Sequence, residues 1–162
     1  MRLLLLTKLL VLLTVANGSP VLIKKFCGSN LAAAVDGGVR FFDGRPLFGP
    51  SKTIRGVLVA IAATAAAALL LGFEVTIGIV VGSAAMAGDL CSSFLKRRLD
   101  YRPSSRATGI DQIPEALLPL IACRYWLALT VPEILVGVVV FMIGEILLSL
   151  LLYRFGIRDR PY

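Results

Sequence analysis

Three short stretches of this chain hold the side chains that could bind a charged ligand. The first, FGPSKTIRG at 48–56, brings glycines, Lys52, Thr53 and Arg55 directly before an apolar run. Glycines allow close backbone approach, and the N-terminus of a helix favours an anion. The segment is not a phosphate loop, because residues 50–51 shift the lysine out of the register of GxxxxGK[ST]. It indicates either a phosphate contact at a helix start or a basic flank without a ligand.

The second stretch, GDLCSSFLKRR at 88–98, places Asp89 inside an apolar run. An ionisable group in such a run costs roughly a few kcal/mol unless it is paired or hydrated, so it is a candidate functional group. Helical spacing places Asp89, Ser93 and Lys96 on one face. The alternative is a carboxylate that pairs with a nearby arginine for structural reasons alone.

The third stretch, GIDQIPE at 109–115, has Asp111 just before another apolar run. Aspartate before a helix with proline in its first turn is a common capping signal. The functional alternative pairs Asp111 with Asp89. Two carboxylates surrounded by Lys and Arg offer hard oxygen ligands to a metal and positive charges to phosphates. This combination predicts a site for a polyphosphate bound to Mg²⁺.

The composition places this chemistry in a membrane. Of 162 residues, 57% are hydrophobic, which is far more than a soluble domain of this size buries. The net charge is +7, and the absence of histidine excludes general acid–base catalysis by imidazole. Three widely spaced cysteines lack metal-ligand spacing and are expected to act as small hydrophobic residues.

The apolar runs predict an all-α integral membrane protein of about five transmembrane helices in a single domain, 1–162. The expected spans are Leu3–Ala16, Ile54–Gly72, Val75–Phe94, Ile113–Thr130 and Ile134–Tyr153. The first span is short and contains Lys8, so it could instead be a signal peptide that is cleaved after Ala16. Small residues at 78–88 predict close helix packing.

The distribution of charge favours a retained first helix. Two large loops, after the first and third helices, and the tail carry most of the basic residues, whereas the opposite turns carry only Glu74 and Glu133. Because cytoplasmic loops collect Lys and Arg, we expect the N-terminus outside, the C-terminus in the cytoplasm and a multi-pass protein of the cell membrane. The basic residues are Lys24, Lys25, Arg40, Arg45, Lys52, Lys96, Arg97, Arg98, Arg102, Arg106, Arg154, Arg158 and Arg160.

Two further charges, Arg124 and Glu145, lie inside the fourth and fifth expected spans. They could meet across the turn at 131–132, although their different distances from it require the arginine to stretch. We expect these two charges to be buried for structural reasons, in preference to a catalytic role.

Four motifs together resemble the CDP-archaeol synthases, which are membrane cytidylyltransferases related to the CDP-diacylglycerol synthases. The motifs are ANGSPVL, DGGVRFFDGRPLFGPSKTIRG, GDLCSSFLKRRL and GIDQIPE, in this order from the first helix to the start of the fourth. The resemblance implies transfer of CMP from CTP to 2,3-bis-O-geranylgeranylglyceryl phosphate, with Mg²⁺ and release of pyrophosphate. The lipid phosphate is already an anionic nucleophile, so the lack of histidine is no obstacle.

The resemblance also implies roles for individual residues. Asp89 and Asp111 would be the Mg²⁺ ligands, with Lys96 as a further catalytic group. The residues expected to contact phosphates of CTP and lipid are Lys52, Thr53, Arg55, Lys96, Arg97 and Arg98, and those expected to add polar contacts are Asn17, Asp43 and Ser93. The expected partners are CTP, a lipid phosphate and the bilayer, without nucleic acid, and no oligomeric state is predicted.

Three alternatives remain open from the sequence. The first is the same reaction on a diacyl phosphatidic acid. The second is a non-catalytic membrane protein that binds anionic lipids through its basic loops, although this would leave Asp89 unexplained. The third is a small transporter or channel, which would require polar residues along several spans.

Overall fold

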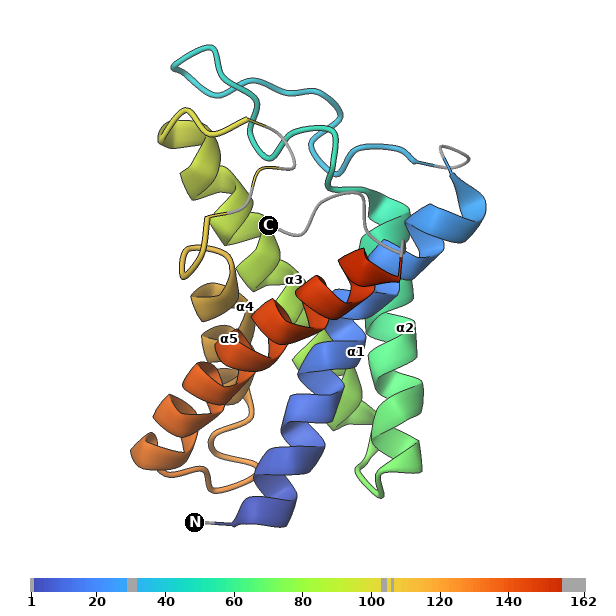
Figure 1. Ribbon diagram of the computed structural model, residues 1–162, viewed down its shortest axis with the longest axis vertical. Coiled ribbons are helices and arrows are strands. Elements are labelled where there is room, and N and C mark those ends of the chain that lie inside the picture. The colour runs from blue at the N-terminus through green and yellow to red at the C-terminus, as the bar shows by residue number, and fades with distance from the viewer. Residues whose placement is uncertain (1, 29–31, 103–104, 106, 156–162) are drawn as a thin grey trace.

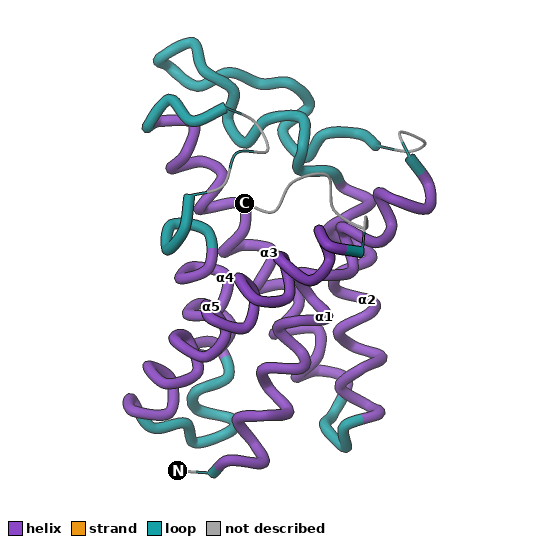
Figure 2. Tube along the Cα trace, in the orientation of Figure 1, coloured by secondary structure: helices purple, strands orange, loops and turns teal. Residues whose placement is uncertain are grey.

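The described part of the chain folds into five helices joined by loops. A computed structural model describes residues 2–28, 32–102, 105 and 107–155 (Figures 1 and 2). The helices are α1 (Leu3–Cys27), α2 (Ile54–Leu70), α3 (Val75–Arg98), α4 (Gln112–Ala122) and α5 (Val131–Arg154). In these ranges the only β-type pairing is two isolated bridges, both in the loop between α1 and α2. The all-α class is therefore confirmed for the described residues.

Three helices, α1, α3 and α5, are long and apolar enough to cross a membrane, and α2 and α4 are shorter apolar helices. Figure 1 shows the two long loops, 28–53 and 99–111, at the same end of the bundle, which we call the loop end. The N-terminus and the turns at 71–74 and 123–130 lie at the opposite end, the turn end. The two basic loops therefore share one side, as expected, whereas Arg106, Arg158 and Arg160 lie outside the described residues.

Helix α1 is longer than expected, because it passes Ala16 and continues to Cys27 with Pro20 inside it. A Cβ placed on Gly56 would lie 3.4 Å from the Cβ of Pro20, so this second half of α1 packs against the start of α2. The packing explains why the glycine and proline at 18–20 do not end the helix. Leucines of the first half are fully buried in the core: Leu9, Leu12 and Leu13.

The start of α1 is fastened to the turn between α4 and α5. The guanidinium of Arg2 lies 3.2 Å from the Glu133 carboxylate and donates to the carbonyls of Leu127 and Ala128. Thr130 and Glu133 form a reciprocal capping box that begins α5. The first helix is thus an integral part of the bundle at both of its halves.

The expected fourth span, Ile113–Thr130, is wrong as a single helix. Helix α4 ends at Ala122, and residues 123–130 form turns in which Ala128 has a φ of 48°. The capping box at Thr130 starts α5 before the expected Ile134 and so interrupts the apolar run. Arg124 consequently lies in an exposed turn, 6.0 Å from the Tyr125 ring, and the expected burial of its charge is also wrong.

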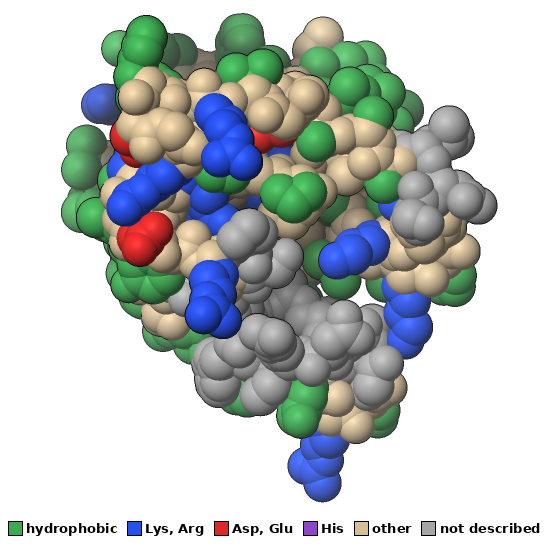
Figure 3. Space-filling view, turned by 90° about the horizontal axis from the view of Figure 1, so that it is seen from above, with side chains coloured by type: hydrophobic (Ala, Val, Ile, Leu, Met, Phe, Trp, Pro, Cys, Tyr) green, Lys and Arg blue, Asp and Glu red, His purple; other side chains and the backbone are tan. Residues whose placement is uncertain are grey.

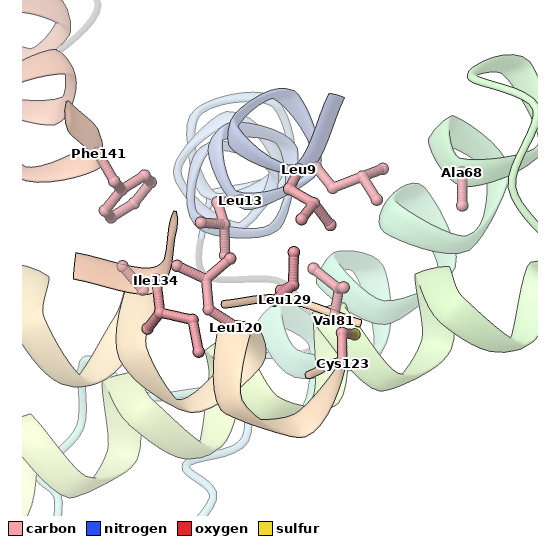
Figure 4. Packing of buried hydrophobic residues seen from close by; sticks show 11 residues of the cluster. Leu9, Leu13, Ala68, Val81, Leu120, Cys123, Leu129, Ile134 and Phe141 are labelled. Atoms are coloured by element: carbon pink, nitrogen blue, oxygen red, sulfur yellow. The ribbon is translucent and has the colours of Figure 1, made fainter. Parts of the chain in front are cut away.

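The core lies between α1 and the other four helices (Figure 4). Leu13 of α1, Val81 of α3, Leu120 of α4 and Phe141 of α5 are all buried in it. The small residues of α3 allow close packing, as predicted, because a Cβ on Gly78 would lie 2.6 Å from the Cα of Ala65 in α2. Cys123 is buried in the same core and acts there as a small hydrophobic residue.

Candidate functional site

Two charged residues of α3, Asp89 and Lys96, each form an ion pair with a residue from a loop at the loop end. Asp89 and Lys96 lie two turns apart, on one face of the helix. The Nζ atom of Lys52, from the loop before α2, lies 2.5 Å from Oδ1 of Asp89. The Nζ atom of Lys96 lies 2.6 Å from Oδ1 of Asp111, just before α4. Two lysines and two aspartates from three segments thus converge on α3.

The ammonium of Lys52 stays charged in this environment. Burial by itself lowers the pKa of Lys52, but the nearby carboxylate of Asp89 outweighs this effect, with weaker contributions from Glu115 and Asp111. The net result is a pKa above the ordinary value of a lysine. At neutral pH the group is therefore a fixed cation among carboxylates.

Asp111 precedes α4 but does not cap it through its side chain. Oδ1 of Asp111 binds Lys96, and its Oδ2 accepts a hydrogen bond from the backbone N–H of Ala107 at 3.0 Å. The side chain of Gln112 accepts a hydrogen bond from Gly109 instead. The capping interpretation of Asp111 is therefore wrong, and this carboxylate serves to hold Lys96 and the preceding loop.

Sequence reasoning missed one acidic residue, Glu115. Its side chain is buried in α4, within hydrogen-bonding range of Asp89 and within electrostatic reach of Lys52. It comes this close because Gly88 lets the backbones of α3 and α4 touch: a Cβ on Gly88 would lie 2.3 Å from the carbonyl oxygen of Pro114. The signal that could have identified Glu115 is its position one helical turn after Asp111 at the start of an apolar run.

Arg97 is the most deeply buried cation of the loop end, at 4% exposure. Its Nη2 donates to the carbonyl of Arg102 at 2.9 Å. Its Nε and Nη1 are buried and have no acceptor among the residues that the structure describes. Buried donors without a partner are costly, so this guanidinium is a candidate contact for an anionic ligand, and its predicted role in phosphate binding stays a prediction.

Arg98 and Asp43, both predicted to contact the ligand, bind each other at 2.9 Å. Arg98 also donates to the carbonyl of Pro46, and its guanidinium lies over the rings of Phe41 and Phe94, at 4.7 and 5.0 Å from their centroids. Together these contacts hold the loop between α1 and α2 against the end of α3. In this arrangement both side chains position the loop.

The glycine-containing segment before α2 is organised by an internal carboxylate. Asp36 accepts the backbone N–H groups of Phe48 and Gly49 at 2.9 and 2.8 Å, and that of Gly38 at 3.0 Å. Burial alone raises the pKa of Asp36, but these three donors outweigh it and lower the pKa below the ordinary value. Gly49 has a φ of 94°, which few other residues adopt. The backbone donors of this segment therefore bind Asp36, and Lys52 is the group that reaches the site.

The helix start that follows is also satisfied internally. Oγ1 of Thr53 accepts a hydrogen bond from the N–H of Gly56 at 3.2 Å, as an N-cap of α2. Nη2 of Arg55 donates to the carbonyl of Gly28 at the end of α1 at 3.0 Å. These two predicted phosphate contacts thus connect α2 to its surroundings at the loop end.

The last two residues predicted to contact the ligand, Ser93 and Asn17, lie in different surroundings. Ser93 is buried one turn after Asp89, on the charged face of α3. The amide of Asn17 donates to the carbonyl of Leu13 within α1, at 3.0 Å. Its neighbour Ala16 packs with a small cluster of α2 and α3 residues. Ser93 therefore belongs to the converging set, whereas the Asn17 amide is bonded within its own helix.

Viewed from above, the loop end gathers Lys and Arg side chains around a few carboxylates (Figure 3). Among the described residues, no three Asp, Glu or Cys side chains are arranged to hold a metal by themselves. Mg²⁺ is usually bound by one or two carboxylates together with substrate phosphates. The carboxylate oxygens of Asp89 and Asp111, with the unpartnered donors of Arg97 in electrostatic reach of Asp111, fit a metal that arrives with a phosphate ligand.

Comparison with known proteins gives a consistent result. The family model described as CarS-like, CDP-archaeol synthase, matches residues 1–162. A CDP-archaeol synthase of Sulfurisphaera tokodaii is 31% identical over 156 residues, covering 91% of this chain and 89% of that one. One of Hyperthermus butylicus is 37% identical over 119 residues, covering 68% of each chain.

A solved structure described as an intramembrane enzyme for archaeal membrane lipid biosynthesis superposes with a TM-score of 0.75. It is 26% identical in sequence, and the match covers 88% of this chain and 91% of that one. The likeness therefore extends over most of the chain.

Proposed function

The chain belongs to the CDP-archaeol synthase family, and we propose how its loop end carries out the reaction of that family. The protein is a membrane cytidylyltransferase: it transfers CMP from CTP to the phosphate of an unsaturated archaeal ether lipid, 2,3-bis-O-geranylgeranylglyceryl phosphate. The products are CDP-archaeol and pyrophosphate.

The chemistry makes modest demands on the protein. An oxygen of the lipid phosphate attacks the α-phosphorus of CTP, and the bond from this phosphorus to the oxygen that bridges to the β-phosphate breaks. Pyrophosphate leaves with the electron pair of that bond. The attacking oxygen is already anionic, so no general base is required, which suits a chain without histidine. Catalysis then consists of positioning and of neutralising negative charge.

The buried guanidinium of Arg97 carries the assignment of the loop end as the phosphate site. Its two unpartnered donors are matched by the oxygen atoms of a phosphate group. Lys52 and Lys96 lie in the same converging set and add positive charge without a backbone rearrangement. In this proposal Arg55, Arg98 and Thr53 act mainly by holding the loops that shape the site, and Ser93 contributes a hydroxyl.

We propose that Mg²⁺ is bound at the loop end, with Asp89 and Asp111 as the carboxylates that the sequence assigns to it. When bound, Mg²⁺ would neutralise charge on the triphosphate and so favour departure of pyrophosphate. The chain's own contribution is to hold both carboxylates through Lys52 and Lys96, so that their oxygens and two cations face the same ligand. This arrangement suits a metal–triphosphate, which carries charges of both signs.

The proposed topology follows from the positions of the basic loops. With the loop end in the cytoplasm, the N-terminus lies outside and α5 returns the C-terminus to the cytoplasm. CTP would then reach the site from the cytoplasm, while the lipid phosphate would approach from the bilayer between the helices. Labelling of single cysteines placed in the turns at 71–74 and in the loop at 36–46 would test this orientation.

The test of the function is transfer of label from α-labelled CTP into lipid extract by the purified protein. The ether lipid phosphate and a diacyl phosphatidic acid are compared in parallel, each with Mg²⁺ and with EDTA. Incorporation with the ether lipid that EDTA abolishes supports the proposal, and equal incorporation with the diacyl lipid would broaden the substrate class. No incorporation by folded protein with either lipid would contradict it and favour a non-catalytic lipid-binding protein.

The matched variant for this assay is Asp89→Asn, which keeps the size of the side chain and removes its charge. Turnover should fall by at least about a hundredfold, because the carboxylate that would hold the metal is lost. A wild-type rate for this variant would remove Asp89 from the metal site.

A further inference from the structure

We propose that Glu115 is a ligand of the divalent cation, acting together with Asp89 across the contact between α3 and α4. This inference rests on the proposed function, in which a metal-bound nucleotide occupies the loop end. It adds a residue to which the resemblance assigns no role.

The contact between the two helices places the carboxylates side by side. A Cβ on Gly88 would lie 2.3 Å from the carbonyl oxygen of Pro114 and 2.8 Å from the backbone nitrogen of Glu115. The backbones of α3 and α4 therefore touch at the residues that directly adjoin Asp89 and Glu115. The helix contact therefore brings the two residues that carry these carboxyl groups close together.

The charges of this pair are not balanced by the protein alone. Glu115 is 7% exposed and lies within hydrogen-bonding range of Asp89. Lys52 is the cation that interacts with both carboxyl groups. When both carboxyls are ionised, these two groups and Lys52 carry one negative charge in excess, and Glu145 of α5 is a further carboxyl group within electrostatic reach of Glu115. Adjacent carboxylates repel each other unless a proton or a cation is shared between them. A divalent cation with oxygen preference fits that position.

Glu115 adds a third carboxylate to the proposed pair of Asp89 and Asp111. Both oxygens of Asp111 are already engaged, one by Lys96 and the other by the N–H of Ala107. A separate observation indicates that the ligand also includes an anion. Arg97, in electrostatic contact with Asp111, is 4% exposed and keeps two buried donors without an acceptor in the described part of the chain. A cation at Asp89 and Glu115 with a phosphate at Arg97 satisfies both groups.

The test is binding of Mn²⁺, as a spectroscopic substitute for Mg²⁺, to the purified full-length protein in detergent without nucleotide. Electron paramagnetic resonance reports the free Mn²⁺ at each concentration. Glu115→Gln should weaken Mn²⁺ binding by at least about tenfold, as expected for loss of a group that binds or orients a metal. Asp89→Asn should do the same. Glu74→Gln is the matched control, because it removes one exposed carboxylate at the turn end and should bind Mn²⁺ like the wild type.

A second substitution covers the possibility that Glu115→Gln disturbs the helix contact. Glu115→Asp keeps the charge but withdraws the carboxylate by one methylene, and should bind Mn²⁺ with an affinity between those of the wild type and Glu115→Gln. The KM for Mg·CTP should rise in the same order, whereas the KM for the lipid phosphate should change little. A glutamate with a purely structural role would not raise the KM for Mg·CTP while leaving the KM for the lipid phosphate nearly unchanged.

The outcomes separate this inference from the function on which it rests. Weak binding in Asp89→Asn with wild-type binding in both Glu115 variants would overturn the role of Glu115 and leave the metal site in place. No saturable Mn²⁺ binding by the wild type would overturn the role of Glu115 as a ligand of the cation, whereas the proposed function is decided separately by the label-transfer assay with CTP and lipid phosphate. Loss of binding in the Glu115 variants, with normal binding in Glu74→Gln, would support the inference.

Discussion

The contact between α3 and α4 at Gly88 gives the sharpest prediction, for the substitution Gly88→Ala. The added Cβ would lie 2.3 Å from the carbonyl oxygen of Pro114, whereas ordinary contacts begin at 3.4 Å, so the two backbones must separate by about 1 Å. Overpacking of this kind typically costs about 1–3 kcal/mol of stability. The same separation moves Asp89 away from Glu115, and Lys96 away from Asp111.

The functional loss should exceed what the lost stability explains. A misplacement of about 1 Å in a catalytic arrangement can lower the rate about a hundredfold. The assay is the initial rate of label transfer from CTP to lipid, divided by the folded fraction from thermal denaturation of the same sample. We expect the rate per folded molecule to fall at least about thirtyfold in Gly88→Ala, which is less than the hundredfold loss given above.

The control is Gly78→Ala, which creates a similar overlap far from the charged face. Its Cβ would lie 2.6 Å from the Cα of Ala65, at the contact between α2 and α3 near the turn end. It should lower stability by a comparable amount but leave the rate per folded molecule within about threefold of the wild type, since no charged group moves. Equal losses of rate in the two variants, or a wild-type rate in Gly88→Ala, would refute the argument that this helix contact positions the site.

Three further predictions concern other parts of the molecule. Arg97→Gln should raise the KM for CTP or for the lipid phosphate about 10- to 100-fold in the label-transfer assay. The melting temperature should not fall, because the substitution removes buried donors that lack an acceptor. An unchanged KM for both substrates would contradict this prediction. Lys8→Met should lower the free energy of unfolding by about 1–2 kcal/mol in detergent with unchanged turnover, because the carbonyl of Leu71 loses a donor at 2.7 Å; an unchanged melting temperature would exclude this role. Because the pKa of Asp36 is lowered in the folded protein, its contribution to stability is present above pH 3.8 and is lost as the pH falls through the folded pKa. Because the pKa of Lys52 is raised in the folded protein, its contribution is present below pH 10.5 and is lost as the pH rises through the folded pKa. The melting temperatures of the wild type and Asp36→Asn should therefore differ by a constant amount between pH 3.8 and pH 10.5 and become equal only in acid. Equal melting temperatures near neutral pH would show that the sign of the Asp36 contribution is wrong.

Several features of the protein follow from local pattern. The apolar runs predict the helical membrane class, because a bilayer requires every backbone group to bond within its own helix. The spacing of Asp89 and Lys96 predicts their common face, which the structure confirms. The basic residues of the two long loops predict that these loops lie at one end, and the small residues near Gly78 predict close packing of α2 and α3.

Other features could not be predicted, because they depend on neighbours that are distant in sequence. The early end of α4 follows from the capping box at Thr130 and from the fastening of Arg2 to Glu133, far apart along the chain. A hydrophobicity pattern contains no information on such a contact. The length of α1 likewise depends on packing of Pro20 beside Gly56.

The sequence by itself determined the inventory of this site, since residue types and helical spacing fix which charges lie beside the two long loops. Only the tertiary structure decided which charges meet. Arg98 was indistinguishable from Arg97 in the sequence, yet Arg98 binds Asp43 through Nη1 and leaves only Nε buried without a partner, whereas Arg97 leaves both Nε and Nη1. Glu115 came next to Asp89 only because two backbones touch at Gly88. Electrostatic pairing falls off over a few ångströms, so it depends on how the helices pack, which periodicity does not encode.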